Sequence, residues 1–279
     1  MEPNFYSKHS DVQKVDNAYV IKKYSRWIKW ETRGARILDV GCGDGFTTTE
    51  LLLPRIPRNF EKLVGSDLSQ KMVDFANATR QKENITFLQQ DIGADSCQRG
   101  LVAQFDHVFS FYCLHWVPHQ KNAFANIHEM LRPGGDVLLS FLGNHPLYDI
   151  YENLSKKIQW APYFLKDFVS PYHHSKRPEE DVNIFMRQSG FIGCNCVVET
   201  RRFVFDTWDQ VTKTLAAIDP TIKQLGSEDQ SKYIADFIEE ARKVLWDKLV
   251  TSNNNNEEKI PIDYKLIVVY GRKSSKVEL

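Results

Sequence analysis

The sequence shows no excess of either charge and no long hydrophobic run. Its 36 lysine and arginine residues balance 36 aspartate and glutamate residues, so its charge does not favour nucleic acid or an anionic membrane surface. No stretch approaches the roughly 18 apolar residues that cross a bilayer, and the N-terminus lacks the basic start and apolar run of a signal peptide. We therefore expect a cytoplasmic protein with no nucleic-acid partner and no stable membrane insertion.

Cysteine and metal-ligand patterns are also sparse. The five cysteines are odd in number and lie mostly within apolar runs, which predicts reduced, buried thiols. Cys194 and Cys196 are separated by one residue, whereas zinc-binding pairs favour about two to four, and no second pair follows. His173 and His174 have no carboxylate or cysteine at a fitting spacing, so we expect a solvated loop there. The sequence predicts no metal site.

The chain of 279 residues does contain an alternation of short apolar runs and helical patterns. The runs are Arg36–Gly41, Leu63–Ser66, Ile85–Gln89, Phe105–Phe111, Asp136–Phe141, Phe191–Glu199 and Tyr264–Tyr270. After the second run, Ser69 is predicted to cap a helix. The alternation predicts an α/β fold in which helices cover both faces of a mostly parallel sheet.

The pattern changes after about residue 144. Residues 146–172 are rich in aromatic side chains, well above the 12% of the whole chain. These are Tyr148, Tyr151, Trp160, Tyr163, Phe164, Phe168 and Tyr172. Such a segment lines an apolar cavity or forms the core of a cap. Further along, Ser227 and Gln230 predict a capping box at the start of an amphipathic helix, and residues 252–258 predict a polar loop.

A glycine turn follows the first predicted strand. The segment Gly41-Cys42-Gly43-Asp44-Gly45 lets the backbone approach a ligand closely and turn without a Cβ clash. A dinucleotide fold would need a third glycine at position 46, where Phe46 stands, so the spacing argues against a nicotinamide oxidoreductase. Asp39 lies inside the strand, and a buried carboxylate is costly unless a cation or donors pair with it. A cationic ligand with a free amino group would supply that partner.

Acidic residues also follow the next two predicted strands. Asp67 lies where a carboxylate accepts hydrogen bonds from ribose hydroxyls. Asp91 and Ile92 lie where a carboxylate reads an adenine amino group and an apolar side chain covers the ring. Ligands of open α/β sheets bind at the carboxyl ends of the strands, where all three residues fall. Spacing alone indicates only a nucleoside-like ligand, because an aspartate at such a place is also a common turn former.

These motifs resemble those of class I S-adenosylmethionine-dependent methyltransferases. The resemblance is carried by Ile37–Gly45, Asp67, Asp91-Ile92, Phe105-Asp106 and Leu131-Arg132-Pro133-Gly134-Gly135. It implies a Rossmann-like sheet of seven strands with the last one antiparallel, helical and aromatic cap insertions, S-adenosylmethionine as methyl donor and S-adenosylhomocysteine as product. By motif, the implied cofactor-binding residues are Asp39, Gly41, Cys42, Gly43, Asp67, Leu68, Asp91, Ile92, Ser110 and His115. The implied organisation is one methyltransferase domain over residues 1–279, with a core at about 33–144, 184–205 and 262–272 and substrate-cap elements at about 1–30, 145–183 and 206–261.

Two further segments resemble the insect juvenile hormone acid methyltransferases. They are Asp11–Asp16 near the N-terminus and Phe111–Val117 after the fourth predicted strand. That family methylates farnesoic acid and juvenile hormone acids, which are lipophilic chains ending in a carboxylate. By motif, Gln13 and Trp116 are the implied catalytic contacts to the substrate carboxylate. The aromatic residues of the 146–172 segment, together with Trp208, would then line a hydrophobic tunnel.

The implied chemistry suits neutral side chains. A carboxylate is already ionised at pH 7, so its methylation needs no general base, only alignment and exclusion of water. An amide and an indole are neutral donors that orient an anion. The residues alone leave alternatives open: Trp116 as a core aromatic, Gln13 as a surface residue and His115 as a packing residue. A hydroxyl or amine acceptor, a non-catalytic lipid-acid or cofactor-binding protein, and a monomer or a homodimer also stay open.

Overall fold

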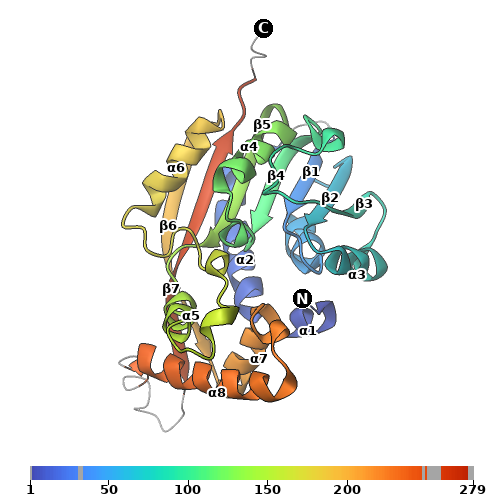
Figure 1. The fold of residues 1–279 in the computed structure, drawn as a ribbon. Coiled ribbons are helices and arrows are strands. Elements are labelled where there is room, and N and C mark those ends of the chain that lie inside the picture. Colours follow the sequence, from blue (N-terminus) through green and yellow to red (C-terminus); the bar gives the residue numbers. More distant parts are fainter. Residues whose placement is uncertain (1, 31–33, 247–248, 250–258, 276–279) are drawn as a thin grey trace.

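A computed structural model describes residues 2–30, 34–246, 249 and 259–275. Within these residues, seven strands form one sheet in the order β3-β2-β1-β4-β5-β7-β6 (Figure 1). The strands are β1 (Arg36–Val40), β2 (Lys62–Asp67), β3 (Ile85–Gln89), β4 (Phe105–Phe111), β5 (Leu131–Leu142), β6 (Ile192–Phe205) and β7 (Ile260–Arg272). Neighbours from β3 to β5 are parallel, whereas β7 is antiparallel to both β5 and β6. The predicted Rossmann-like α/β sheet with its last strand antiparallel is confirmed.

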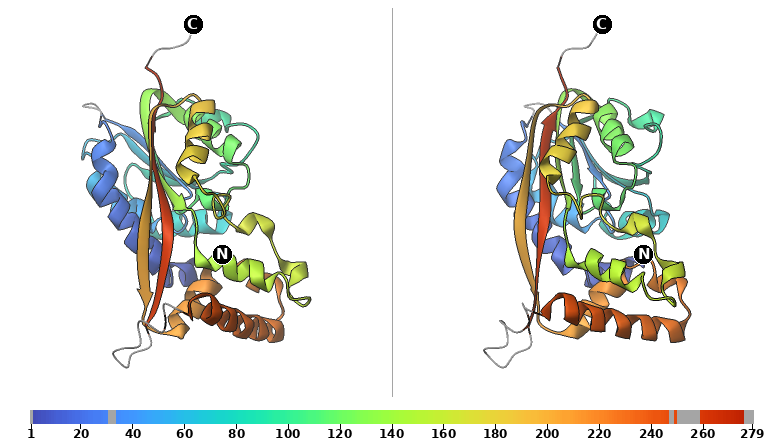
Figure 2. Two further views of the ribbon diagram at one scale, coloured as in Figure 1. Left: turned by 90° about the vertical axis from the view of Figure 1, so that its left-hand side faces the viewer. Right: turned by 60° about the vertical axis from the view of Figure 1, so that its left-hand side comes forward.

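Helices cover both faces of this sheet. Among them are α1 (Pro3–Lys8), α2 (Asp11–Tyr24), α3 (Gln70–Arg80), α4 (Gln120–Met130), α5 (Pro146–Leu154), α6 (Pro178–Gln188), α7 (Trp208–Ile218) and α8 (Ser227–Val244). Figure 2 shows α2 on one face and both α4 and α6 on the other. Because both faces are covered, every residue of β4 is buried, including Asp106 and His107. No helix of the described chain is long and apolar enough to cross a membrane.

The fifth strand begins earlier than its sequence predicts. It starts at Leu131, directly after α4, and pairs Leu131 with Phe105 before the register shifts. The motif Leu131-Arg132-Pro133-Gly134-Gly135 is therefore the irregular first part of β5. Gly135 lies tightly packed there, since a Cβ on it would stand 2.7 Å from the carbonyl oxygen of Asp106.

The helices predicted from hydrophobic periodicity are present, but the capping bonds predicted at their first residues are not. Ser69 precedes α3, but its side chain makes no capping bond, and its backbone N–H instead donates to Asp67. The capping box predicted at Ser227 and Gln230 is wrong, because Gly226 holds the N-cap position and the Gln230 amide donates to the Leu225 carbonyl. The polar loop predicted at 252–258 lies outside the described residues.

The aromatic segment forms the core of a cap. We define the cap as α5, the short helices Ala161–Tyr163 and Lys166–Phe168, α7 and α8, which lie together below the sheet in Figure 1. Tyr151 packs on Phe237 of α8 with ring centroids 6.0 Å apart, and Trp160 packs on Tyr233 at 5.2 Å. The Trp160 indole also donates to Asp236 at 2.6 Å. These rings fasten α5 and the following loop to α8.

We predict that Gly135→Ala lowers the free energy of unfolding by about 1–3 kcal/mol, because backbone atoms must move to admit the methyl group. The matched control is Gly100→Ala, where a Cβ would meet no atom within 4 Å. Urea unfolding of both variants measures the difference. Equal stability of the two variants would contradict this account of the Leu131–Gly135 segment.

Candidate active site

Two cavities of opposite chemistry meet at the carboxyl ends of β1 and β4. The polar one is lined by side chains that include Ser10, Asn17, Asp39, Cys42, Asp44 and Thr47. The apolar one is lined mainly by aliphatic and phenylalanine side chains, among them Val12, Leu142, Phe205, Val211, Leu215 and Phe237. Gln13 and Tyr112 line both. These two residues therefore stand where the cavities adjoin.

The glycine turn forms one wall of the polar cavity. Gly41 and Gly43 have φ values of +73° and +55°, in the left-handed region that favours glycine. A Cβ on Gly41 would stand 2.3 Å from the Cys113 sulfur, so only glycine fits at this crossing. The Gly43 N–H donates to Asp67 at 2.9 Å, and the Ser69 N–H donates to the other carboxylate oxygen at 2.9 Å. The turn and the end of β2 are thereby tied together.

Asp39 is the buried acid of the polar cavity. Its side chain is 1% exposed and accepts one hydrogen bond from the Thr48 hydroxyl at 2.6 Å. Burial raises the pKa of Asp39 to about 7, and the nearby Asp67 charge adds to the rise while the Thr48 bond opposes it. No cation of the described chain pairs with Asp39. The carboxylate is therefore prepared to accept a positively charged ligand.

Further acceptors in the polar cavity lack partners within the described residues. They are Gln13 Oε1, Asn17 Oδ1 and Asp44 Oδ2, all buried. Unpaired buried acceptors are costly, so a ligand that fits here carries several donors. The ammonium and hydroxyl groups of S-adenosylmethionine match this demand, and the residues present fit that cofactor.

Several predicted cofactor residues lie near the strand ends but do not line the polar cavity. Asp91 is exposed and accepts a hydrogen bond from the Gly93 N–H at 2.8 Å. Ile92 is buried in the core, and the Ser110 hydroxyl donates to the Val40 carbonyl inside the sheet at 2.8 Å. Leu68 is 65% exposed. Of the predicted set, Asp39, Gly41 and Cys42 line the cavity itself, with Gly43 and Asp67 bonded behind it.

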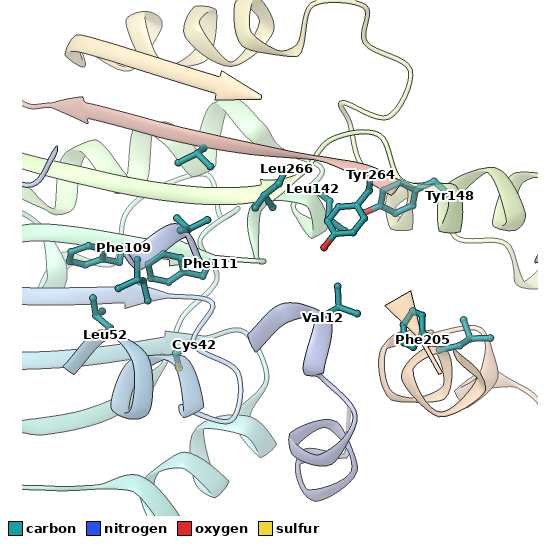
Figure 3. Packing of buried hydrophobic residues seen from close by; sticks show 14 of the residues in the cluster. Val12, Cys42, Leu52, Phe109, Phe111, Leu142, Tyr148, Phe205, Tyr264 and Leu266 are labelled. Carbon is teal, nitrogen blue, oxygen red and sulfur yellow. The ribbon is translucent and has the colours of Figure 1, made fainter. Parts of the chain in front are cut away.

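The apolar cavity lies between the sheet and the cap. Figure 3 shows Val12 of α2 facing Tyr264 of β7, with Phe205 nearby at the end of β6. The prediction that the aromatic residues of 146–172 and Trp208 line a tunnel is wrong, because these rings pack into the cap and elsewhere in the core. From that segment, Pro146, Leu147 and Ile150 line the cavity instead.

Trp116 and His115 lie in the short helix Leu114–Trp116 and both line the apolar cavity. The Trp116 ring stacks on Phe168 with centroids 4.2 Å apart. His115 was expected to touch the cofactor, but it is buried beside the apolar cavity, where its Nδ1 accepts from the Leu142 N–H at 3.3 Å. Burial, with a smaller contribution from His145, lowers the pKa of His115 to about 3. His115 is therefore neutral at pH 7.

Sequence reasoning missed several residues at this junction. Asn17 lines the polar cavity one helical turn after Gln13, so its i+4 spacing was a usable signal. Asp44 stands inside the glycine turn itself. Tyr112 gave no signal, because its place depends on a φ of +56° that the sequence does not reveal.

The His173-His174 pair is not a simple solvated loop. His173 is buried, with Nε2 3.1 Å from Asp149 and Nδ1 3.1 Å from the Asn144 amide nitrogen. The exposed His174 Nε2 lies 2.8 Å from Glu152. The fold thus supplies carboxylates that sequence spacing did not suggest. Each imidazole already has a hydrogen-bond partner, so the group is satisfied as a polar network that ties this loop to α5.

We predict that Asp39→Asn changes how stability depends on pH. The folded-state pKa of about 7 lies above the unfolded-state value of about 3.9, so the folded protein holds this proton more tightly. Its free energy of unfolding therefore falls as pH rises from about 4 to about 7. Urea unfolding at pH 5 and pH 8 without cofactor should show a smaller loss in Asp39→Asn than in the unsubstituted protein, by on the order of 2 kcal/mol.

The matched control for that measurement is Asp74→Asn at an exposed position of α3. It should show the same loss between the two pH values as the unsubstituted protein. Parallel losses in all three proteins would refute the assignment of the titrating group to Asp39.

Comparison with known proteins agrees with this geometry. A family model described as a methyltransferase domain matches residues 37–135. The chain is 36% identical to juvenile hormone acid O-methyltransferase of Bombyx mori, covering 97% of this chain and 96% of that protein. It is 32% identical to the Drosophila melanogaster protein of the same name, covering 98% and 92%. Among solved structures, the YcgJ protein of Bacillus subtilis shares the fold, with a TM-score of 0.60, 16% identity and coverage of 92% of this chain and 99% of that one.

The similarity to the two insect proteins runs through the sheet, the glycine turn, α2 and the cap, since it spans nearly the full chain. The family model covers the segment from β1 to the start of β5, which carries the glycine turn and Asp39 of the polar cavity. The chain therefore belongs to the juvenile hormone acid O-methyltransferase family and is a methyltransferase.

Proposed function

We propose that this protein transfers the methyl group of S-adenosylmethionine to the carboxylate of a lipophilic acid such as farnesoic acid or a juvenile hormone acid, releasing S-adenosylhomocysteine. The observation that carries this proposal is the junction of a polar and an apolar cavity, with Gln13 and Tyr112 lining both. A charged cofactor and a long apolar substrate can then meet end to end. The printed names of the two insect relatives support the same substrate class.

The polar cavity is assigned to the cofactor, which supplies an electrophilic methyl group when bound. Asp39 is buried without a cationic partner, and the unpaired oxygens of Asn17 and Asp44 lie in the same cavity. A ligand ammonium would favour the charged form of Asp39 and offset its burial. We keep Asp67 as the predicted acceptor for ribose hydroxyls, since each of its oxygens has lone pairs beyond the one that a backbone N–H uses.

The same assignment extends to the remaining predicted residues at the strand ends. The backbone of Gly41, Cys42 and Gly43 would lie against the cofactor. Asp91 and Ile92, with Leu68, would flank its base. These roles rest on motif and on position at the carboxyl ends of β1, β2 and β3.

The apolar cavity is assigned to the substrate chain, with its carboxylate at Gln13 and Trp116. Both side chains line this cavity, and each carries a neutral donor for a carboxylate: the Gln13 amide NH2 and the Trp116 indole N–H. Among its described lining residues the cavity has no lysine or arginine, and His115 is neutral. Neutral donors orient a carboxylate and leave its charge available for attack on the methyl carbon. The apolar walls exclude water from the attacking oxygen.

A hydroxyl acceptor fits this site less well, because it would need a base to remove its proton. The two histidines that line the apolar cavity are His115 and His145. Each uses Nδ1 to accept a backbone N–H, from Leu142 and Leu147 respectively. Burial also lowers the pKa of His115 to about 3, so it binds a proton too weakly to act as that base. The geometry therefore favours an acceptor that is already ionised.

We predict that the protein converts farnesoic acid, but not farnesol, to a labelled product in the presence of S-adenosylmethionine carrying a radioactive methyl group. The product should be a base-labile ester, because the methyl group is carried on a carboxylate oxygen. A saturated fatty acid of similar length tests how far the cavity is specific for the branched chain. Transfer of the radioactive methyl group to farnesol, or to none of the acids, would contradict the proposal.

We further predict that Gln13→Ala and Trp116→Phe each lower kcat/KM for the acid by about tenfold or more, equivalent to about 1.4 kcal/mol of lost transition-state stabilisation. Each variant removes a donor but leaves the apolar cavity in place. Trp30→Phe is the matched control, since Trp30 packs on His107 at 4.7 Å and lines neither cavity. Steady-state kinetics within twofold of the unsubstituted enzyme for Gln13→Ala and Trp116→Phe would remove both residues from the reaction.

A further inference from the structure

Asp16 belongs to the same N-terminal motif as Gln13 but has no role in the proposed chemistry. It lies on α2 three residues after Gln13, and its side chain is 0% exposed. One carboxylate oxygen accepts from the hydroxyls of Tyr112 at 2.6 Å and Tyr264 at 2.7 Å. The other accepts from Arg201 Nε at 2.8 Å. A buried carboxylate thus has two neutral donors and one cation.

This arrangement joins four separate parts of the fold. Asp16 lies on α2, Tyr112 follows β4, Tyr264 lies in β7 and Arg201 lies in β6. The Arg201 guanidinium also lies 3.8 Å from the centroid of the Tyr19 ring. Two residues of α2, Asp16 and Tyr19, therefore contact Arg201. Three bonds to one residue limit both the rotation and the sliding of α2 relative to the sheet. Removing a single donor weakens the pairing of a buried charge and so loosens the attachment of α2 to the sheet.

The two tyrosines are also walls of the candidate active site. Tyr112 lines both cavities and Tyr264 lines the apolar one. Tyr112 has a φ of +56°, and its backbone N–H donates to the Ser140 carbonyl at 2.8 Å. Burial raises the pKa of both tyrosine hydroxyls, so they stay protonated and serve as donors to Asp16. Their hydroxyls are therefore engaged with α2.

We propose that Asp16 is a positioning residue that sets the place of the Gln13 amide at the junction of the two cavities. The inference rests on the proposed function, because Gln13 is assigned there to the substrate carboxylate. Residues three apart on a helix lie on one face, so fixing Asp16 fixes the turn that carries Gln13. A displacement of about 1 Å at a reacting group lowers rates by up to about a hundredfold. Arg201 balances the Asp16 charge, so the incoming carboxylate does not meet an uncompensated anion.

The test removes one hydroxyl at a time and keeps each ring. Tyr112→Phe and Tyr264→Phe should each lower kcat for the acid by about tenfold or more, while KM changes less than threefold. The matched control is Tyr24→Phe. Tyr24 is on the same helix, is 3% exposed and donates to a different carboxylate, Glu199, but lines neither cavity. Tyr24→Phe should keep the kcat of the unsubstituted enzyme at a similar cost in thermal stability.

A second readout does not depend on activity. Hydrogen exchange of the backbone amides should rise at residues 11–16 in Tyr112→Phe and Tyr264→Phe, and at the far end of α2 in Tyr24→Phe. Unchanged exchange at residues 11–16 in both variants overturns the inference, as does unchanged kcat in an active enzyme. Equal loss of kcat in Tyr24→Phe would show a merely structural effect and also overturn it. If the unsubstituted enzyme methylates no acid, the proposed function fails, and the exchange measurement still decides whether Asp16 positions α2.

Discussion

Burial of both faces of the parallel sheet is the constraint on which the rest of this structure depends. With α2 on one side and α4 and α6 on the other, a polar group in a strand interior is costly unless it is hydrogen-bonded. Polar side chains inside the sheet, such as Ser110 and Asp106, bond to neighbouring backbone. Side chains that can contact a ligand therefore lie at the carboxyl ends of the strands, where the chain turns. Both cavities lie there.

Two buried carboxylates show how the same residue type serves two purposes. Asp16 is fully paired by two hydroxyls and a guanidinium, and such a group stabilises one arrangement of the elements that it joins. Asp39 has a single hydroxyl partner and a raised pKa, and such a group is incomplete until a cation arrives. The first holds α2 to the sheet, and the second gives the polar cavity its preference for a positively charged ligand. The difference lies entirely in the donors that the fold brings to each.

The described lining residues of the apolar cavity include no lysine or arginine. A cationic side chain beside the substrate would bind a carboxylate more tightly but would also reduce its reactivity toward the methyl carbon. The described lining residues instead offer an amide, an indole and the neutral imidazole of His115 among aliphatic side chains. The aromatic rings of the cap are used elsewhere: they hold α5 to α8, so that Leu147 and Ile150 face the cavity from a rigid helix. The cap therefore shapes the cavity without lining it with its own aromatic core.

The sequence by itself determined the α/β alternation, the glycine turn and the acidic residues at the strand ends, because these depend on local periodicity and on φ values that only glycine adopts easily. Gln13 and Trp116 were indicated only through resemblance to a family, and the fold brings both to the wall of the apolar cavity. The tertiary structure decided what depends on distant partners. Whether the aromatic segment lines a tunnel, whether His173 meets a carboxylate, and whether Tyr112 reaches Asp16 are settled by contacts between residues 24 to 96 positions apart. Local pattern carries no information about such contacts, because their energy exists only once the sheet and the cap have packed.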